Sequence, residues 1–254
     1  MIAHGAASPS PVALVTGASR GIGRAVALEL GRAGFAVVVN YAHAAAKADE
    51  TVAALAASGA TAVAIRADVG DVEAVRAMFR EIDTRFGRLD ALVNNAGVAR
   101  RVDAITAIDD DTWRRTLAVN LDGAFFCMRE AIPRFRARGA GRIVNVSSGA
   151  ALTGGTIGAH YAASKAGLVA LTVRAARELA ADRIAVNAVL PSVIDTDMAA
   201  ELAATAEARE RLRSMIPIGR FGTAEEVAAV VRFLCVEAPD YLTGEAIGLR
   251  GGRA

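Results

Sequence analysis

Short apolar runs alternate with amphipathic segments along almost the whole chain, and this alternation constrains the fold more than any other feature. The runs are continuously apolar, which is typical of strands buried on both faces of a parallel sheet. They cover residues 12–16, 36–40, 61–65, 91–93, 142–146, 184–190 and 246–249. The amphipathic segments predict helices at residues 22–33, 44–58, 71–86, 111–138, 159–181 and 223–236. We therefore expect a single-domain, doubly wound, mostly parallel sheet of about seven strands with helices on both faces.

The length and even texture of the chain indicate one domain. A chain of 254 residues suits one large α/β sheet, and no internal repeat or linker divides residues 12–254. Residues 1–11 lack the features of a signal peptide and are predicted to be a flexible leader. Residues 191–220 follow a predicted strand with a proline turn and a short helical pattern. We expect this segment to form a lid over a site.

Composition excludes several classes of function. The net charge is +2 and the arginines form no basic run, so no nucleic-acid partner is expected. No apolar stretch reaches the ~18 residues that a membrane span needs, so no membrane partner is expected either. Cys127 and Cys235 lie in apolar helical contexts and are predicted to be buried, reduced thiols. The histidines share no metal-ligand spacing, so we expect no metal site. Taken together, these features predict a cytoplasmic protein.

A glycine-rich turn follows the first predicted strand. It spans residues 17–23 and contains Gly17, Gly21 and Gly23. Glycines let a backbone turn tightly and approach a pyrophosphate, and the following helix N-terminus offers unpaired N–H groups. The turn therefore predicts a dinucleotide phosphate site, although a purely structural turn explains the glycines equally well.

The end of the second predicted strand bears on the choice of cofactor. NAD-binding folds place an Asp or Glu there for the ribose 2′-hydroxyl, but this chain has Asn40-Tyr41. Arg20 adds a cation inside the glycine turn. The missing carboxylate and the added cation predict NADP(H) in preference to NAD(H). The alternative is that Arg20 is a solvated loop charge, and His43 is interpreted as a surface histidine.

Tyr161 and Lys165 stand four residues apart at the start of a predicted helix, so they face the same side. An ammonium beside a phenol favours phenolate, so we expect the pKa of Tyr161 to be lowered toward neutrality. Such a phenol can donate and accept protons. The chain has only one other lysine, Lys47, which favours a special role for Lys165. The same spacing also arises by chance on surface helices.

Polar residues follow two further predicted strands, where ligands of such sheets bind. The strand at 142–146 runs into Ser147-Ser148, and a hydroxyl there can bind a substrate carbonyl. The strand at 91–93 ends in the segment 94–97, whose asparagines can shape the floor of a cofactor site. In isolation, both segments would be ordinary turns.

Together these residues resemble the short-chain dehydrogenase/reductases, a family of Rossmann-fold oxidoreductases. The resemblance extends from about residue 12 to residue 252, and the texture is most similar to the 3-oxoacyl-(acyl-carrier-protein) reductases. Its motifs occur in the family's order: Thr16-Gly17-x-x-x-Gly21-x-Gly23, Asp68, Asn94-Asn95-Ala96-Gly97, Asn120, Ser148 and Tyr161-x-x-x-Lys165.

The resemblance implies a role for each catalytic residue. Tyr161 would be the general acid/base, and Lys165 would bind the nicotinamide ribose and lower the pKa of Tyr161. Ser148, rather than Ser147, would orient the carbonyl, and Asn120 would hold a water of a proton relay. The residues implied to bind the cofactor are Gly17, Ser19, Arg20, Gly21, Ile22, Gly23, Asn40, Tyr41, Asp68, Val69, Asn95, Ala96, Gly97, Tyr161, Lys165 and Thr196.

The chain departs from the family pattern at two places. Pro191 is followed by Ser192 where the family usually has glycine, which puts a side chain near the expected nicotinamide site. Arg250 precedes Gly251-Gly252 where the family often has Asp, which bears on a subunit contact.

The resemblance implies the reduction of a ketone, such as a 3-oxoacyl thioester on a carrier protein or coenzyme A, with NADP(H). A sugar, polyol or secondary-alcohol dehydrogenase working oxidatively is the alternative, and a catalytically silent NADP(H)-binding protein is a third hypothesis. We expect substrate specificity to lie in residues 99–110, 149–160 and 191–215. Family members commonly form homotetramers through their long helices, so a homotetramer or homodimer is expected.

Overall fold

The computed structural model describes residues 10–202 and 205–253, and the predicted leader at 1–11 lies largely outside this part. Seven parallel strands form one sheet in the order β3-β2-β1-β4-β5-β6-β7. The strands are β1 (Val12–Val15), β2 (Ala36–Tyr41), β3 (Ala62–Arg66), β4 (Ala91–Asn94), β5 (Gly141–Val146), β6 (Ile184–Pro191) and β7 (Ala246–Leu249). The predicted sheet, its number of strands and its single Rossmann-like domain are confirmed.

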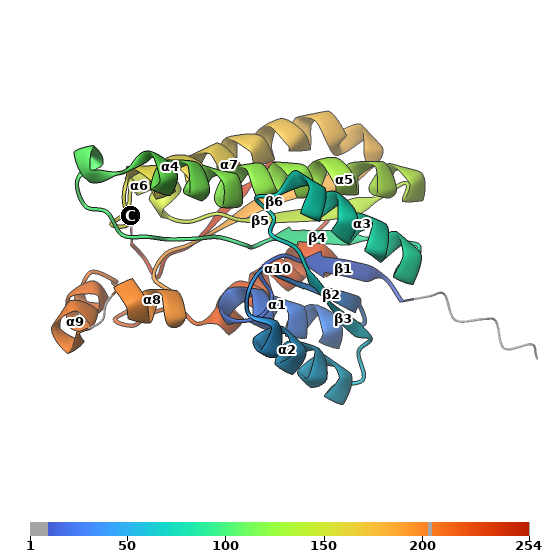
Figure 1. Cartoon of the computed structure of the whole chain (residues 1–254), viewed down its shortest axis with the longest axis horizontal. Helices are drawn as coiled ribbons and strands as arrows, with labels where there is room; N and C mark the ends of the chain where they lie inside the picture. Colours follow the sequence, from blue (N-terminus) through green and yellow to red (C-terminus); the bar gives the residue numbers. More distant parts are fainter. Residues whose placement is uncertain (1–9, 203–204, 254) are drawn as a thin grey trace, which may run out of the picture.

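Helices cover both faces of the sheet (Figure 1). One face carries α1 (Gly21–Arg32), α2 (Ala45–Ala57) and α10 (Ala224–Val236). The other carries α3 (Val72–Phe86), α4 (Asp110–Leu117), α5 (Gly123–Arg138), the short α6 (Ala150–Thr153) and α7 (Ala159–Leu179). Two 3-10 turns, Ile105–Ala107 and Ala180–Asp182, complete these connections.

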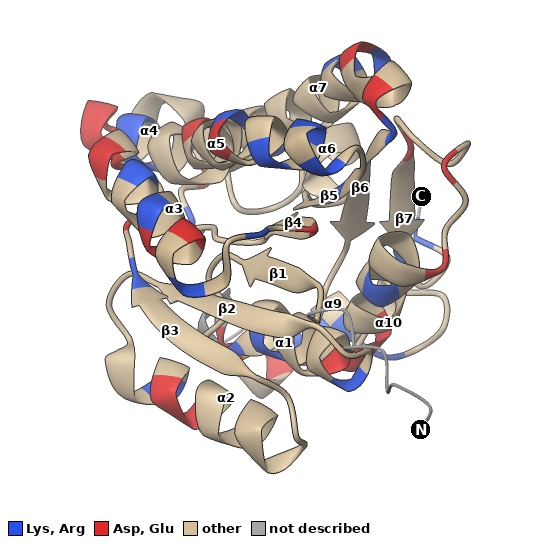
Figure 2. Ribbon diagram, turned by 90° about the vertical axis from the view of Figure 1, so that its right-hand side faces the viewer, with Lys and Arg blue, Asp and Glu red and all other residues tan. Residues whose placement is uncertain are grey.

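The core lies in two layers, one on each side of the sheet. Val12 and Leu14 of β1 pack toward the layer that includes α3, α5 and α7. Their neighbours Ala13 and Val15 pack toward α1 and α10. Successive side chains of a strand point to opposite faces, so a strand covered on both faces must be apolar at every position. Charged residues therefore lie mainly on the helices, as Figure 2 shows.

The predicted helix at 111–138 is not uniform. A π-helical turn, Ala118–Asp122, joins α4 to α5 and contains Asn120. Such turns widen an α-helix by one residue and occur often at functional sites. Apolar periodicity does not signal them, because the helix on either side keeps its ordinary period.

The segment after β6 extends past the carboxyl ends of the strands. It contains α8 (Asp197–Leu202) and α9 (Ala206–Ser214), which Figure 1 shows beyond the end of the sheet. A parallel bridge between Ile194 and Gly222 closes the base of this segment. Within the described part of the chain, no helix combines the length and apolarity needed to cross a membrane.

Candidate active site

A cleft of about 730 Å³ runs along the carboxyl ends of the strands, where ligands of such sheets bind. All the residues predicted to be catalytic or cofactor-binding line this cleft except Asn120, which is buried beside it. We call the part that contains Arg20, Tyr41, Asp68 and Asp197 the β2 side. The part that contains Ser148, Tyr161 and Lys165 is the β5 side.

The glycine turn forms the floor between the two sides. Gly17 and Gly21 adopt the left-handed region, with φ of 62° and 55°, which side chains disfavour. A Cβ at Gly23 would lie 2.3 Å from the Gly17 carbonyl oxygen and 2.4 Å from Asn95 Nδ2, so no side chain fits there. The α1 helix then begins at Gly21 without a side-chain cap, which leaves its first N–H groups available to an anion.

Buried polar side chains tie this turn to its neighbours. Thr16 Oγ1 accepts from the backbone N–H groups of Asn95 (2.9 Å) and Ala96 (3.0 Å), and Asn95 Nδ2 donates to the Thr16 carbonyl (2.9 Å). Asn40 Oδ1 accepts from the Gly17 N–H at 3.2 Å, and its Nδ2 donates to the Ala67 carbonyl at 3.0 Å. The side chains of Asn40 and Asn95 therefore fix the conformation of the glycine turn that forms the floor of the cleft.

Asp68 on the β2 side is held by a residue that the sequence did not reveal. Arg115 of α4 lies 2.7 Å from Asp68 Oδ2, and the Gly70 N–H donates to Asp68 Oδ1 at 3.0 Å. Burial opposes ionisation of Asp68, but these hydrogen bonds outweigh it and lower the pKa. Asp68 is therefore a fixed anion. No sequence motif contains Arg115, and it was not among the predicted site residues.

Tyr161 and Lys165 of α7 lie on the same face of the helix and both line the cleft. Lys165 Nζ lies 5.9 Å from the centroid of the Tyr161 ring and donates to the Val146 carbonyl at 2.9 Å. Both residues are buried, with 7% and 4% of their surface exposed. The predicted helical pairing is therefore present in the structure.

The predicted direction of the Tyr161 pKa is wrong in this structure. Burial raises the pKa of Tyr161, and a hydrogen bond with Ser148 opposes that rise without cancelling it. Burial also lowers the pKa of Lys165 to about 8. Desolvation is the cause of the lysine shift, because the Val146 carbonyl that accepts from the ammonium replaces only part of its lost hydration.

The structure separates the two adjacent serines. Ser147 Oγ donates to the Lys165 carbonyl at 2.8 Å and is buried, so its hydroxyl is committed to the backbone of α7. Ser148 Oγ accepts from the Ala150 N–H at 3.1 Å and is half-buried beside Tyr161. Ser148 therefore has a hydroxyl available to a ligand in the cleft.

Asn120 holds the wall of the cleft through three side-chain hydrogen bonds. Its Oδ1 accepts from the Val98 N–H (2.8 Å), and its Nδ2 donates to the Val98 carbonyl (3.1 Å) and to Ser164 Oγ (3.2 Å). Ser164 in turn donates to the Tyr161 carbonyl at 2.7 Å. The amide thus links the segment after β4 to the helix that carries Tyr161, and Ser164 is a link that the sequence motifs did not single out.

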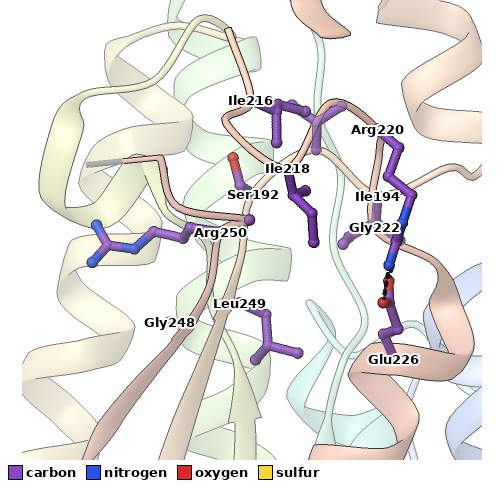
Figure 3. A pocket seen from close by; sticks show the side chains of 12 residues that line it. Ser192, Ile194, Ile216, Ile218, Arg220, Gly222, Glu226, Gly248, Leu249 and Arg250 are labelled. Carbon is purple, nitrogen blue, oxygen red and sulfur yellow. Dashed lines mark hydrogen bonds and ion pairs between the residues drawn. The ribbon is translucent and has the colours of Figure 1, made fainter.

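The two departures from the family pattern, Ser192 and Arg250, line one smaller cavity of about 260 Å³. Figure 3 shows Ile218 and Leu249 among the side chains that line it, while Arg250 extends away from them. The Arg250 stem lies near Gly149, where a Cβ would be 3.6 Å from its Cδ. An ion pair between Arg220 and Glu226 at 2.6 Å closes the opposite wall.

The remaining candidate groups carry no reactive chemistry. Cys127 and Cys235 are free and buried, and burial raises the pKa of each thiol to about 12. In the part of the chain that the structure describes, no group of acidic, histidine or cysteine side chains could hold a metal ion.

Comparison with known proteins agrees with this geometry. The family model described as enoyl-(acyl carrier protein) reductase matches residues 17–253. The 3-oxoacyl-(acyl-carrier-protein) reductase of Staphylococcus aureus is 42% identical over 240 residues, which are 94% of this chain and 96% of that protein. The corresponding reductase of Synechocystis is 40% identical over 242 residues, covering 95% and 96%.

Solved structures agree as well. A protein of Sinorhizobium meliloti 1021, described as a short-chain alcohol dehydrogenase, superposes with a TM-score of 0.90 at 38% identity and covers 96% of both chains. A short-chain dehydrogenase/reductase from Burkholderia xenovorans gives a TM-score of 0.88 at 33% identity, covering 97% of this chain and 98% of that one. The fold and the cleft define a Rossmann-type oxidoreductase. This chain belongs to the short-chain dehydrogenase/reductase family.

Proposed function

We propose that this protein reduces a ketone to a secondary alcohol with NADP(H), with Tyr161 as the proton donor. The observation that carries the proposal is that Ser148, Tyr161 and Lys165 line the same cleft as the glycine turn. A dinucleotide whose phosphates lie on that turn has room to extend to the β5 side. The close approaches at Gly17 and Gly23 and the uncapped start of α1 fit such a cofactor.

Tyr161 suits proton donation. Its raised pKa keeps the phenol protonated at neutral pH, as a general acid for a developing alkoxide must be. Ser148, hydrogen-bonded to Tyr161, orients the carbonyl oxygen toward that phenol. Lys165 offers its ammonium to the ribose hydroxyls, and Asn120 acts as a positioning residue through Val98 and Ser164. When bound, the reduced nicotinamide supplies the hydride.

The β2 side supports NADP(H) over NAD(H). The end of β2 presents Asn40 and Tyr41, and the Asn40 amide is committed to the Gly17 N–H and the Ala67 carbonyl. No carboxylate at this point is left to accept from a ribose 2′-hydroxyl. Arg20 lines the cleft close by, with its side chain half-exposed, and suits a 2′-phosphate.

We propose a 3-oxoacyl thioester, carried by a carrier protein or coenzyme A, as the substrate. The names of the Staphylococcus aureus and Synechocystis relatives support this substrate class. The complete set of Ser148, Tyr161 and Lys165 speaks against a silent binding protein.

Two exposed apolar faces support the predicted assembly into a homotetramer or homodimer. Trp113 and Phe125 project from α4 and α5, while Phe233 and Val236 lie on α10. Two separate faces suit an assembly with two kinds of interface. Sedimentation analysis tests it, since a monomeric protein would contradict the proposal.

Replacement of Tyr161 by Phe tests the proposed chemistry. We expect kcat for NADPH oxidation with a 3-oxoacyl thioester to fall by about 10²- to 10⁴-fold, because the general acid is lost. NADPH affinity, measured by fluorescence titration, should change little. Tyr241→Phe is the matched control, because that side chain is fully exposed. Wild-type turnover by Tyr161→Phe would overturn the mechanism.

A further inference from the structure

Two cations from different elements meet a single carboxylate oxygen at the rim of the β2 side. Arg20 Nη1 lies 3.3 Å and Lys47 Nζ 3.4 Å from Asp197 Oδ2. Arg20 immediately precedes α1, Lys47 is in the first turn of α2, and Asp197 is the first residue of α8. Arg20 and Asp197 line the cleft, so the site formed by Arg20 and Lys47 opens on the cofactor cleft. All three side chains are about half-exposed, so the contacts can exchange with solvent or a ligand.

The start of α2 adds to the positive charge at this place. Its N-cap, Ala44, has no side-chain hydrogen bond to the helix, and no acidic residue lies in its first turn. By contrast, α3, α4, α9 and α10 begin with an Asp or Thr whose side chain caps them: Asp71, Asp109, Thr205 and Thr223. Ala44 also lines the cleft. The α2 N-terminus therefore presents uncapped N–H groups and a positive dipole end toward the same rim.

Asp197 acts as an internal anion at this rim. The hydrogen bond from Lys47, and then that from Arg20, lower the pKa of Asp197, so it is a carboxylate at neutral pH. A carboxylate offers one negative charge and two oxygens. A phosphate monoester carries a charge of about −1.5 to −2 and three oxygens, so it outcompetes a carboxylate for a pair of cations.

We propose that Lys47 is a second ligand for the cofactor 2′-phosphate, beside Arg20, and that Asp197 competes with that phosphate for both cations. The inference rests on the proposed use of NADP(H) and adds to it a selectivity residue on α2 and an internal competitor on α8. The competition between Asp197 and the phosphate would also affect the position of α8. Thr196, next to Asp197, lies against the start of α1, where a Cβ at Gly21 would be 3.6 Å from Thr196 Cγ2.

The predicted lid at 191–220 is therefore attached to the β2 side through Asp197. A 2′-phosphate on Arg20 and Lys47 would release the start of α8, and a cofactor without that phosphate would leave the attachment in place. Figure 1 shows α8 on the same side of the sheet as α1 and α2, as this coupling requires.

Equilibrium titrations of the full chain test the inference. The ligands are NADPH, NADH, 2′,5′-ADP and 5′-AMP, and the variants are Lys47→Ala, Asp197→Asn and Arg24→Ala. Arg24 is the matched control, because it is an exposed cation on α1 that does not line the cleft. We expect Lys47→Ala to weaken NADPH and 2′,5′-ADP about tenfold and to leave NADH and 5′-AMP unchanged.

The Asp197 variant reports on the competition. Asp197→Asn keeps the size of the side chain and removes its charge, so it should tighten NADPH and 2′,5′-ADP about two- to fivefold, the range of exposed ion pairs. The gain in affinity for NADPH from Asp197→Asn should be smaller when Lys47→Ala is also present. Without Lys47, Asp197 no longer competes with the phosphate for that cation. Arg24→Ala should change none of these affinities.

Contrary outcomes separate this inference from the proposed cofactor preference. Equal losses for NADPH and NADH in Lys47→Ala would assign Lys47 a structural role and overturn the inference. So would weaker NADPH binding in Asp197→Asn. If the wild-type chain binds NADH as tightly as NADPH, both proposals fail. If NADPH is preferred and Arg20→Ala removes the preference while Lys47→Ala does not, only this inference fails.

Discussion

On the β2 side of the cleft, the charged side chains are partly exposed and each cation has a carboxylate within reach, whereas Lys165 on the β5 side is buried against a neutral carbonyl. Arg20 lies beside Asp197 and Arg115 beside Asp68, but Lys165 donates to the Val146 carbonyl. Exposed pairs in high dielectric contribute little energy and exchange partners readily, which suits recognition of a phosphate. A buried amine loses hydration that a carbonyl replaces poorly. This loss lowers the pKa of the amine, and such shifted groups are typical of catalytic sites.

The largest expected effect of breaking this contrast is on turnover. Lys165→Met removes the ammonium beside Tyr161, and we expect kcat with NADPH to fall by about 10²- to 10⁴-fold. Lys165→Arg should not restore it, because a planar guanidinium cannot take the place of a compact ammonium against the Val146 carbonyl. Steady-state kinetics of both variants measure this. Near-normal turnover by Lys165→Arg would show that only positive charge matters there.

The pH dependence of stability sharpens the same contrast. In the folded chain the pKa of Lys165 is lowered from 10.5 to about 8, so between these values the unfolded chain binds more protons. Wild-type stability should therefore rise with pH across this window, and burial of the charge should cost of the order of 3 kcal/mol below pH 8.

Lys165→Met lacks this titration. Its stability relative to wild type should be greatest below pH 8 and should decline as the pH approaches 10.5. Denaturant unfolding without cofactor measures the difference. The raised pKa of Tyr161 makes folding less favourable only as pH rises above 10, so the two proteins are compared below that pH. A pH-independent difference would contradict a desolvated amine.

A smaller effect is expected at Asn120, which joins the wall of the cleft to α7. Asn120→Ala leaves the half-buried Val98 N–H and carbonyl without their side-chain partner, so we expect a loss of about 1 to 3 kcal/mol in unfolding free energy. We also expect kcat to fall more than the affinity for NADPH. Asn120→Asp should not restore the stability, because it keeps the Oδ1 acceptor but loses the donor to the Val98 carbonyl and buries a carboxylate. Equal kinetics for Asn120→Ala and wild type would refute a positioning role.

The smallest effect is expected on the exposed side. Arg20→Gln should raise KM for NADPH about tenfold, because one charged contact to the 2′-phosphate is lost, and should leave kcat unchanged. KM for NADH should stay at its wild-type value. Kinetics at two salt concentrations add a check, because screening should narrow the gap between variant and wild type. A parallel rise for NADH would mean that Arg20 holds the glycine turn instead.

Much of the fold was predictable, because a strand that is buried on both faces must be apolar at every position. Each predicted strand agrees with an observed strand to within a residue at each end. The same holds for α1, α2 and α10. Periodicity missed the π-helical turn at Asn120 and did not divide the lid into α8 and α9. The reason is that a one-residue widening barely disturbs an apolar stripe, and the lid has few buried side chains to set a period.

For the site, the sequence predicted which residues line the cleft better than it predicted their charge partners and pKa values. Motifs that end strands predicted which residues would line the cleft, because parallel strands bring their carboxyl ends to one edge. The motifs did not reveal the partners from other elements, such as Arg115 for Asp68 or Ser164 for Asn120. Nor did they predict that Lys165 would turn toward the Val146 carbonyl.

The amino-acid sequence by itself determined the order of the elements, the parallel sheet and the membership of the cleft. These follow from local periodicity, glycine turns and the rule that strand ends gather at one edge. Only the tertiary structure decided the state of each charge: which carboxylate meets Arg20 and Lys47, and how far burial raises the pKa of Tyr161 and lowers that of Lys165. The physical reason is that hydration and Coulomb energies depend on distances between residues far apart in the chain, and no local pattern encodes those distances.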